Sequence, residues 1–411
     1  MKKLPSCLPF VTALTVLYLF LLSTALASTL LITNEKSDSV SVFDTETDQV
    51  VKTIAVGKTP HAIGVIMNRQ LAYTGNRGDD TISVIDINSM KVVKTIKLPH
   101  TIMNLEVSPG GRYVSANSRT SLHVSFIDTK SNTIIKTVEV GHWAKHEKGK
   151  SAVNMANPDI HAKRGGIMIS HDTWSPDSKY LFVPDRFNYR IAKIDVETFQ
   201  VVDRLQLESP THHMLVAPNG KSMIALNDGV PKHNVPPSVV FFDMKSLRLE
   251  NQITMPLAKG EFAQGHHAGF NLDKTKLYFA NRGKEKGKKR GRTVMVVDLE
   301  NRELISTVEA GHGAGHVTPS PDGKYIFILN HYDNIISVLD AQTNDIIKNI
   351  KIPSLTPKGS IGHSSIFSED GRFYYELSET DGKLLIVNAK KMTFSKAIKV
   401  GDWPSIMVQI N

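Results

Sequence analysis

Residues 316–340, HVTPSPDGKYIFILNHYDNIISVLD, contain the pattern that decides the fold. An apolar segment leads into the turn Ser320-Pro321-Asp322-Gly323-Lys324, a second apolar segment follows it, and a third segment ends at Asp340. Proline and glycine at these offsets favour a tight turn between antiparallel strands, and β-branched residues favour the strands themselves. The stretch therefore predicts three consecutive antiparallel strands.

The same sequence pattern recurs along the whole chain, and a regular recurrence indicates a repeat architecture. The turn returns at 108–112, 175–179, 217–221 and 368–372, with degenerate copies at 67–70 and 272–275. The third segment recurs at spacings of about 40 to 55 residues, which is the range of propeller blades, except for the wider step from Val124 to Ile191. Its eight copies are Val40–Asp44, Ile82–Asp86, Val124–Asp128, Ile191–Asp195, Val239–Asp243, Val294–Asp298, Ile336–Asp340 and Leu384–Asn388.

These repeats predict an all-β fold, an eight-bladed β-propeller with four strands in each blade. The N-terminal part, 30–56, supplies second, third and fourth strands but no first strand. The C-terminal segment 400–407 repeats the pattern of 56–63 and stops after one strand. We therefore expect the two ends of the chain to share the closing blade, which pairs an otherwise open sheet edge. A count of seven blades stays open if one degenerate repeat is not a blade.

The N-terminus has the features of an export signal. Lys2 and Lys3 form a positive region, an apolar stretch runs from Leu8 to Leu22, and 25–27 reads Ala-Leu-Ala. This pattern predicts a signal peptide over 1–27 and a mature chain that begins at Ser28. No later segment is long and apolar enough to span a membrane. We therefore expect an exported protein, periplasmic or on the cell surface, without a membrane span after cleavage.

The remaining residues, 28–411, are predicted to form one propeller domain with loop insertions at 141–166 and 284–292. The only cysteine is Cys7, inside the predicted signal. The mature chain would then contain no disulfide, no thiolate ligand and no CxxCH site for covalent heme c. A metal would have to be bound by histidine, methionine, aspartate or glutamate.

Two segments resemble known propeller repeats. Residues 59–65, TPHAIGV, and 72–76, AYTGN, are similar to the YVTN-type repeat of exported and surface proteins. Eight blades with a shared closing blade also resemble the heme d1 propeller of cytochrome cd1 nitrite reductase and the periplasmic propellers of heme d1 assembly. The resemblance implies this cytochrome d1-like fold and, as a candidate ligand, a tetrapyrrole. The missing CxxCH argues against a self-contained cytochrome cd1 enzyme.

Histidines gather where innermost strands are expected to begin. Six of the eight predicted blades have one there, and the other two have Met103-Asn104 and Ser405. These positions account for half of the 16 histidines: His61, His171, His212, His213, His266, His267, His316 and His363. In a propeller these positions meet at one mouth of the central channel. Imidazole suits copper, zinc, iron and nickel.

The metal ligands that we predict from this pattern are His61, His171, His213, His267, His312, His316 and His363. His312 is included because Gly311, Gly313 and Gly315 would let it approach one ion together with His316. A second interpretation stays open. Histidine at a strand start can satisfy nearby backbone groups and bind nothing.

Three arginines follow second strands on the same predicted face: Arg77, Arg186 and Arg282. Arginine forms bidentate pairs with carboxylates, so these residues are candidates to bind the carboxylates of a tetrapyrrole or of another acidic ligand. The alternative is that they pair with acidic residues of their own blades, such as Asp79 or Asp80. Asn330-His331 occupies the equivalent place in a later repeat.

The two insertions differ in character. The first carries His142, His146 and His161, and its length is typical of a functional lid. The second, 284–292, is strongly basic and reads either as a solvated hairpin tip or as a contact for an acidic partner. It has no aromatic residue for stacking on bases, which disfavours nucleic acid.

Two functions remain open from the sequence. The first is binding of a transition metal (copper, zinc or iron) or a heme-type tetrapyrrole at the channel mouth, with a redox or cofactor-assembly role. The second is a non-catalytic interaction module that docks a periplasmic or surface protein. The chain has no nucleophile elbow, phosphate loop or dinucleotide fingerprint, so the sequence assigns neither a reaction nor catalytic residues.

Overall fold

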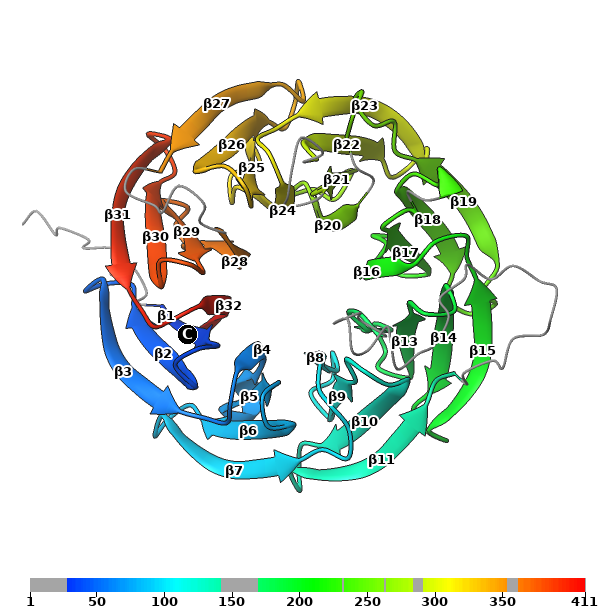
Figure 1. Cartoon of the computed structure of the whole chain (residues 1–411), viewed down its shortest axis with the longest axis vertical. Coiled ribbons are helices and arrows are strands. Elements are labelled where there is room, and N and C mark those ends of the chain that lie inside the picture. The colour runs from blue at the N-terminus through cyan, green and yellow to red at the C-terminus, as the bar shows by residue number, and fades with distance from the viewer. Residues whose placement is uncertain are drawn as a thin grey trace, which may run out of the picture.

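The computed structural model describes residues 28–141, 169–230, 233–261, 264–283, 291–352 and 361–410. These residues form eight four-stranded antiparallel sheets arranged as a ring around a central channel (Figure 1). The prediction of an eight-bladed propeller is confirmed, and the alternative of seven blades is wrong. The predicted signal peptide 1–27 lies outside the described residues. Most of the two predicted insertions, residues 142–166 and 284–290, also lies outside the described residues.

The innermost strands line the channel. They are β4 (Pro60–Ile66), β8 (Asn104–Val107), β12 (Thr173–Trp174), β16 (Thr211–Val216), β20 (Gly265–Phe270), β24 (Ala314–Pro319), β28 (Ile361–Phe367) and β32 (Pro404–Ile410). The second strands are β1 (Thr29–Asn34), β5 (Leu71–Asn76), β9 (Tyr113–Asn117), β13 (Tyr180–Asp185), β17 (Ser222–Asn227), β21 (Lys276–Asn281), β25 (Tyr325–Asn330) and β29 (Phe373–Ser378). A single 3₁₀ turn, η1 (Met67–Arg69), joins β4 to β5 within the described residues.

The third strands contain the eight recurrent segments of the sequence, each extended by one residue at its start. They are β2 (Ser39–Asp44), β6 (Thr81–Asp86), β10 (His123–Asp128), β14 (Arg190–Asp195), β18 (Ser238–Asp243), β22 (Thr293–Asp298), β26 (Ile335–Asp340) and β30 (Lys383–Asn388). The outermost strands are β3 (Gln49–Ala55), β7 (Lys91–Lys97), β11 (Thr133–Glu139), β15 (Gln200–Gln206), β19 (Leu249–Thr254), β23 (Glu303–Glu309), β27 (Ile346–Lys351) and β31 (Thr393–Lys399).

The closing blade is shared between the two ends of the chain, as the sequence predicts. Its strand order is β3-β2-β1-β32, with Leu30 opposite Gln409 and Ile32 opposite Met407. The C-terminal strand thus takes the innermost place beside β1 and removes the last free edge of the ring.

The turns between the first and second strands follow from their sequence. In the turn after β24, the Ser320 hydroxyl donates to Asp322 and accepts from the backbone N–H of Tyr325 at 3.0 Å. Gly323 takes φ +72°, a left-handed conformation that glycine adopts without strain. The turn reverses the chain so that the innermost strand begins, and the second strand ends, at the same mouth of the channel.

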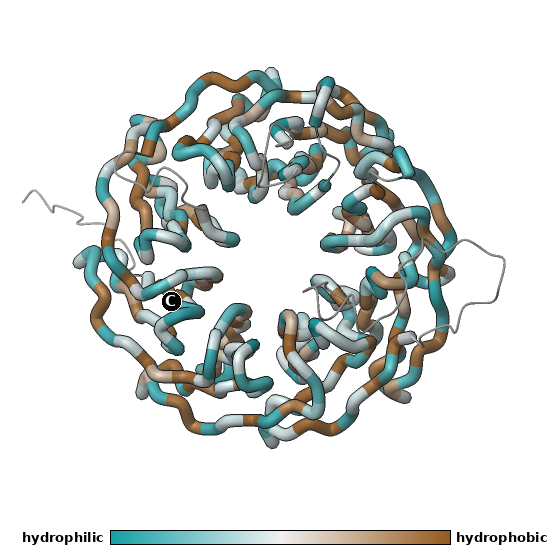
Figure 2. The backbone as a smooth tube through the Cα atoms, in the orientation of Figure 1, coloured by the Kyte–Doolittle hydropathy of each residue, from teal (hydrophilic) through white to brown (hydrophobic). Residues whose placement is uncertain are grey.

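Hydrophobic side chains are buried between neighbouring blades. One such cluster joins Phe327 and Val338 of one blade to Tyr374 and Leu385 of the next. Figure 2 shows hydrophobic residues within the blades and mostly hydrophilic residues next to the channel. The blades supply the core, so the innermost strands are free to carry polar side chains.

Buried asparagines end several second strands and fix the geometry of the mouth. Each donates from Nδ2 to a serine hydroxyl on the third strand, at 2.9 to 3.1 Å. The pairs are Asn34 with Ser41, Asn76 with Ser83 and Asn330 with Ser337. Since Arg77 and His331 directly follow two of these asparagines, this network sets the positions from which both side chains start.

Candidate metal site at the channel mouth

The register of the blades brings strand starts and strand ends to the same mouth. Thr211 at the start of β16 pairs with Asn227 at the end of β17, and Ala314 of β24 pairs with Asn330 of β25. Residues that begin innermost strands and residues that follow second strands are therefore neighbours. This is the arrangement that the sequence predicts.

Irregular pairing at the strand starts directs consecutive histidines to the same place. Successive residues of a regular strand point to opposite faces. The register shifts between Thr211 and His213 in β16, and between Gly265 and Ala268 in β20. Such irregularities redirect side chains. As a result His266 and His267 both join one group of imidazoles.

Eight imidazoles from five blades pack against one another, and we call them the histidine cluster. Its members are His171, His212, His213, His266, His267, His316, His331 and His363. The closest pair is His267 and His316, stacked with ring centroids 4.1 Å apart. The centroids of His266 and His267 lie 4.4 Å apart, and those of His212 and His266 lie 4.8 Å apart. His61 lies at the edge of the cluster, 6.2 Å from His363.

Two groups within the cluster have the geometry of a metal site. The channel trio is His171, His212 and His267, all partly exposed, and the buried trio is His266, His316 and His331. In each trio the three ligand nitrogens lie within 4.8 Å of one another. A tetrahedral ion with nitrogens at about 2.0–2.1 Å needs them about 3.4 Å apart, so a modest rotation of the rings would complete either site.

Burial disfavours the protonated form of most of these imidazoles. It lowers the pKa values of His171, His266, His267 and His316 far below 6.5, and that of His213 to about 4. The positive charges that neighbouring histidines would carry push them in the same direction. Neutral imidazole is the form that binds a metal, so no proton has to leave before an ion enters.

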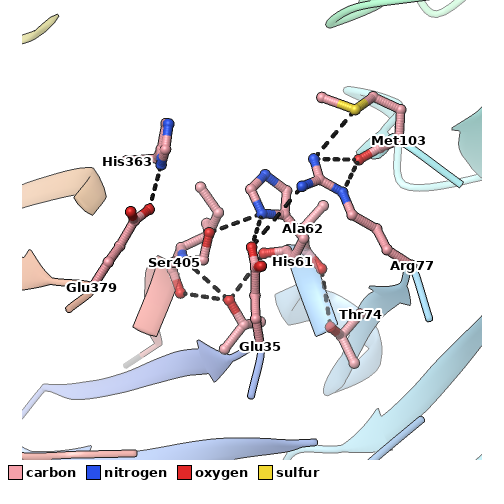
Figure 3. Close-up of polar contacts among 11 residues, drawn as sticks. Glu35, His61, Ala62, Thr74, Arg77, Met103, His363, Glu379 and Ser405 are labelled. Carbon is pink, nitrogen blue, oxygen red and sulfur yellow. Dashed lines mark hydrogen bonds and ion pairs between the residues drawn. The ribbon is translucent and has the colours of Figure 1, made fainter. Parts of the chain in front are cut away.

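Carboxylates anchor three histidines around the cluster. Nδ1 of His61 lies 2.5 Å from Glu35 and 2.8 Å from the Ser405 hydroxyl. Nδ1 of His363 lies 2.6 Å from Glu379 (Figure 3). Nδ1 of His212 lies 3.5 Å from Asp228. Carboxylates on one ring nitrogen commonly orient the other nitrogen toward a metal. These contacts favour Nε2 as the ligand atom of each ring.

The three predicted arginines already have partners in the protein. Arg77 donates to the Met103 carbonyl at 2.9 and 3.0 Å and contacts its sulfur (Figure 3). Arg186 contacts Asp228 at 2.5 Å, and Arg282 lies 3.3 Å from Nε2 of His266. A carboxylated ligand would therefore have to displace contacts within the protein.

Sequence reasoning found part of the two trios. Of the predicted ligands, His171, His267 and His316 belong to them; His213 and His363 belong to the wider cluster. Among the described residues, His312 takes no part in the ring contacts of the cluster, and its backbone N–H donates to Asp333 at 2.7 Å. The predicted ligands omit His212, His266 and His331 of the trios. Two features of the sequence could have revealed them. His212 and His266 each stand next to another histidine, and His331 follows Asn330 at the end of a second strand.

A buried acid lies beside the channel trio. Asn104 on β8 donates to Glu106 at 3.0 Å and contacts Nδ1 of His171 at 3.1 Å, so it connects the two. Burial, reinforced by the charge of Asp172, raises the pKa of Glu106 to about 8. Glu106 therefore stays protonated in the folded chain at neutral pH.

Replacing Glu106 with glutamine is expected to stabilise the protein at alkaline pH. Between pH 4.5 and 8 the folded chain retains a proton that the unfolded chain has lost, so the free energy of unfolding falls as the pH rises. The Glu106→Gln variant removes this loss and keeps an oxygen for Asn104. Its melting temperature should exceed that of the wild type by an increment that grows from pH 5 to pH 8. The exposed Glu46→Gln control should show no such trend, and an equal gain at both pH values would refute the assignment.

Comparisons with known proteins agree with this architecture. Residues 13–155 match the family model described as YNCE-like beta-propeller. Dihydro-heme d1 dehydrogenase NirN, solved in complex with DHE, is similar over 92% of this chain and 74% of its own, with 15% identity and a TM-score of 0.70. These findings confirm the resemblance to heme d1-type propellers as a likeness of fold.

Two further structures share the fold at lower similarity. Hydrazine synthase of Kuenenia stuttgartiensis aligns with 77% of this chain over 93% of its own chain, with 20% identity and a TM-score of 0.55. A functionally unknown protein from Desulfotomaculum acetoxidans DSM 771 aligns with 94% of this chain over 99% of its own chain, with 10% identity and a TM-score of 0.56. No curated protein matches the chain in sequence. Within the described residues, no helix has the length and hydropathy needed to cross a membrane.

Proposed function

We propose that this protein is an exported propeller that binds transition-metal ions through the histidine cluster. The observation that carries the proposal is the pair of trios, in each of which three imidazoles present nitrogens within 4.8 Å of one another. Clustered imidazoles lose their hydrogen bonds to water on burial, and bound ions would replace that lost interaction. An exported chain whose only cysteine lies in its signal would depend on such nitrogen ligands.

Copper and zinc suit these ligands best. Imidazole binds both ions well, and copper is the strongest binder among divalent first-row metals. Each trio supplies three ligands and so leaves a coordination position open, the arrangement found in catalytic rather than structural sites. The proposal therefore includes exchange of a small ligand at the metal, whereas the reaction itself is not assigned.

A tetrapyrrole is the second candidate, favoured by the likeness to NirN, which was solved with DHE bound. The cluster does not fit a macrocycle between its rings, because its closest centroids lie only 4.1 to 4.8 Å apart. Arg77, Arg186 and Arg282 are also bonded within the protein. A tetrapyrrole would have to lie across the mouth, with one histidine as axial ligand and with these arginines released to its carboxylates.

Elemental analysis and a UV-visible spectrum of protein purified from the periplasm without a histidine tag test the proposal. We expect at least one copper or zinc ion per chain, either as isolated or after incubation with the metal and desalting. A Soret band would favour the tetrapyrrole instead. Failure to retain copper, zinc or heme would overturn metal binding and leave the interaction module.

A further inference from the structure

We infer that the two trios form one dinuclear copper centre, in which six histidines bind two adjacent copper ions. The inference rests on the proposed function and specifies its metal and its stoichiometry. The channel trio would bind one ion and the buried trio the other. The two sites share no ligand, but they share a piece of backbone, since His266 and His267 are consecutive.

Contacts between the trios place the two sites side by side. His267 of the channel trio stacks on His316 of the buried trio at 4.1 Å, and His212 lies 4.8 Å from His266. Both separations are shorter than the 5.1 Å between the ring centroids of His212 and His267 within the channel trio. Ions bound at the two sites would be close neighbours, as in two-metal centres where one small ligand can contact both ions.

Unsatisfied ring nitrogens in the buried trio point to a missing ligand there. Nδ1 of His266 and Nε2 of His316 are buried and have no hydrogen-bond partner among the described residues. Arg282, which only donates, lies 3.3 Å from the other nitrogen of His266. For Nδ1 to bind an ion this long contact has to give way, so that Nε2 carries the ring proton. Buried polar atoms without partners are uncommon and need a cause such as a bound ion.

The charges around the cluster favour copper in its singly charged state. Neither trio includes a carboxylate, and Arg282 adds a positive charge beside the buried trio. Two carboxylates contact members of the cluster: Asp228 is largely compensated by Arg186 at 2.5 Å, and Glu379 contacts His363, which belongs to neither trio. The cost of burying an ion rises with the square of its charge, so two copper(I) ions are far less costly here than two zinc(II) ions. Copper(I) also accepts three imidazoles without an anionic ligand.

Copper(I) titration of the metal-free protein tests the stoichiometry. Under anaerobic conditions we expect the wild type to retain two copper ions per chain after desalting. The variant His171→Ala/His212→Ala should retain one, in the buried trio, and His316→Ala/His331→Ala should retain one, in the channel trio. A matched control, His123→Ala/His233→Ala, alters two histidines outside the cluster and should retain two. Circular dichroism confirms that each variant is folded.

Electron paramagnetic resonance after oxidation to copper(II) tests adjacency. In the wild type, coupling between the ions should reduce or split the signal, whereas each single-trio variant should give one uncoupled spin. Two ions whose spectrum is the sum of the variant spectra would overturn the dinuclear centre. Retention of a single ion by the wild type would overturn it too, yet leave metal binding intact. Retention of no copper, together with no retention of zinc or heme in the elemental analysis, would refute the proposed function itself.

Discussion

Lowering the pH from 7 to 5 is expected to reduce the free energy of unfolding of the metal-free protein by at least about 5 kcal/mol, as much as the whole stability of many domains. The cause is the set of histidines whose pKa values are lowered by burial at the channel mouth. They are His61, His171, His212, His213, His266, His267 and His316.

The sign follows from proton binding in the two states. In the unfolded chain these histidines titrate near 6.5, whereas in the folded chain the pKa is about 3 for His61 and about 4 for His213. Below pH 6.5 the unfolded chain therefore binds protons that the folded chain refuses. Each such histidine lowers the free energy of unfolding by about 1.4 kcal/mol per pH unit. The carboxylates of Glu35 and Asp228 raise the pKa values of His61 and His212, respectively, but burial outweighs them and both pKa values stay below 6.5.

Urea unfolding of the metal-free protein at several pH values measures this dependence. The His213→Leu variant removes one titrating group and should give a slope shallower by about 1.4 kcal/mol per pH unit between pH 6 and pH 4.5. The exposed His233→Gln control should keep the wild-type slope. A stability that stays flat between pH 7 and pH 5 would show that the cluster protonates freely without unfolding.

The fold was predictable because its signals are local and repeated. Each blade carries its own turn, such as Ser320 to Lys324, and its own third strand ending in aspartate or asparagine. The pairing of β1 with β32 joins segments nearly 380 residues apart, yet the sequence reveals it because one repeat lacks a first strand at one end of the chain. Repetition thus turned a long-range contact into a pattern visible in the primary structure.

The site was predictable only in part, because its final geometry depends on register. In a regular strand, His266 and His267 would point to opposite faces. The sequence does not predict the shift in strand register that brings both side chains into the cluster. The position of His331 was harder to predict, because this residue follows the end of a second strand and contacts His266 only where neighbouring blades pack together. The partners of Arg186 and Arg282 likewise come from packing and not from sequence neighbours.

Replacing His267 and His316 together by alanine is expected to abolish metal retention. His267 belongs to the channel trio and His316 to the buried trio, so the double variant leaves each site with two imidazoles. Loss of a residue that only orients a ligand typically costs 10- to 100-fold in metal affinity, and loss of a ligand should cost more than about 100-fold. We therefore expect the remaining pair of imidazoles in each site to lose its ion during desalting.

The measurement is elemental analysis after incubation with copper and desalting, with the melting temperature of the same samples. Both histidines lie at the channel and not between blades, and the metal-free variant should keep the fold, since it removes two crowded imidazoles and no core contact. Copper should raise the melting temperature of the wild type and of the His123→Ala/His233→Ala control, because a ligand that binds only the folded chain stabilises it. It should leave the double variant unchanged. Undiminished retention by the folded double variant would show that the metal is bound elsewhere, and the assignment of the trios would then be wrong.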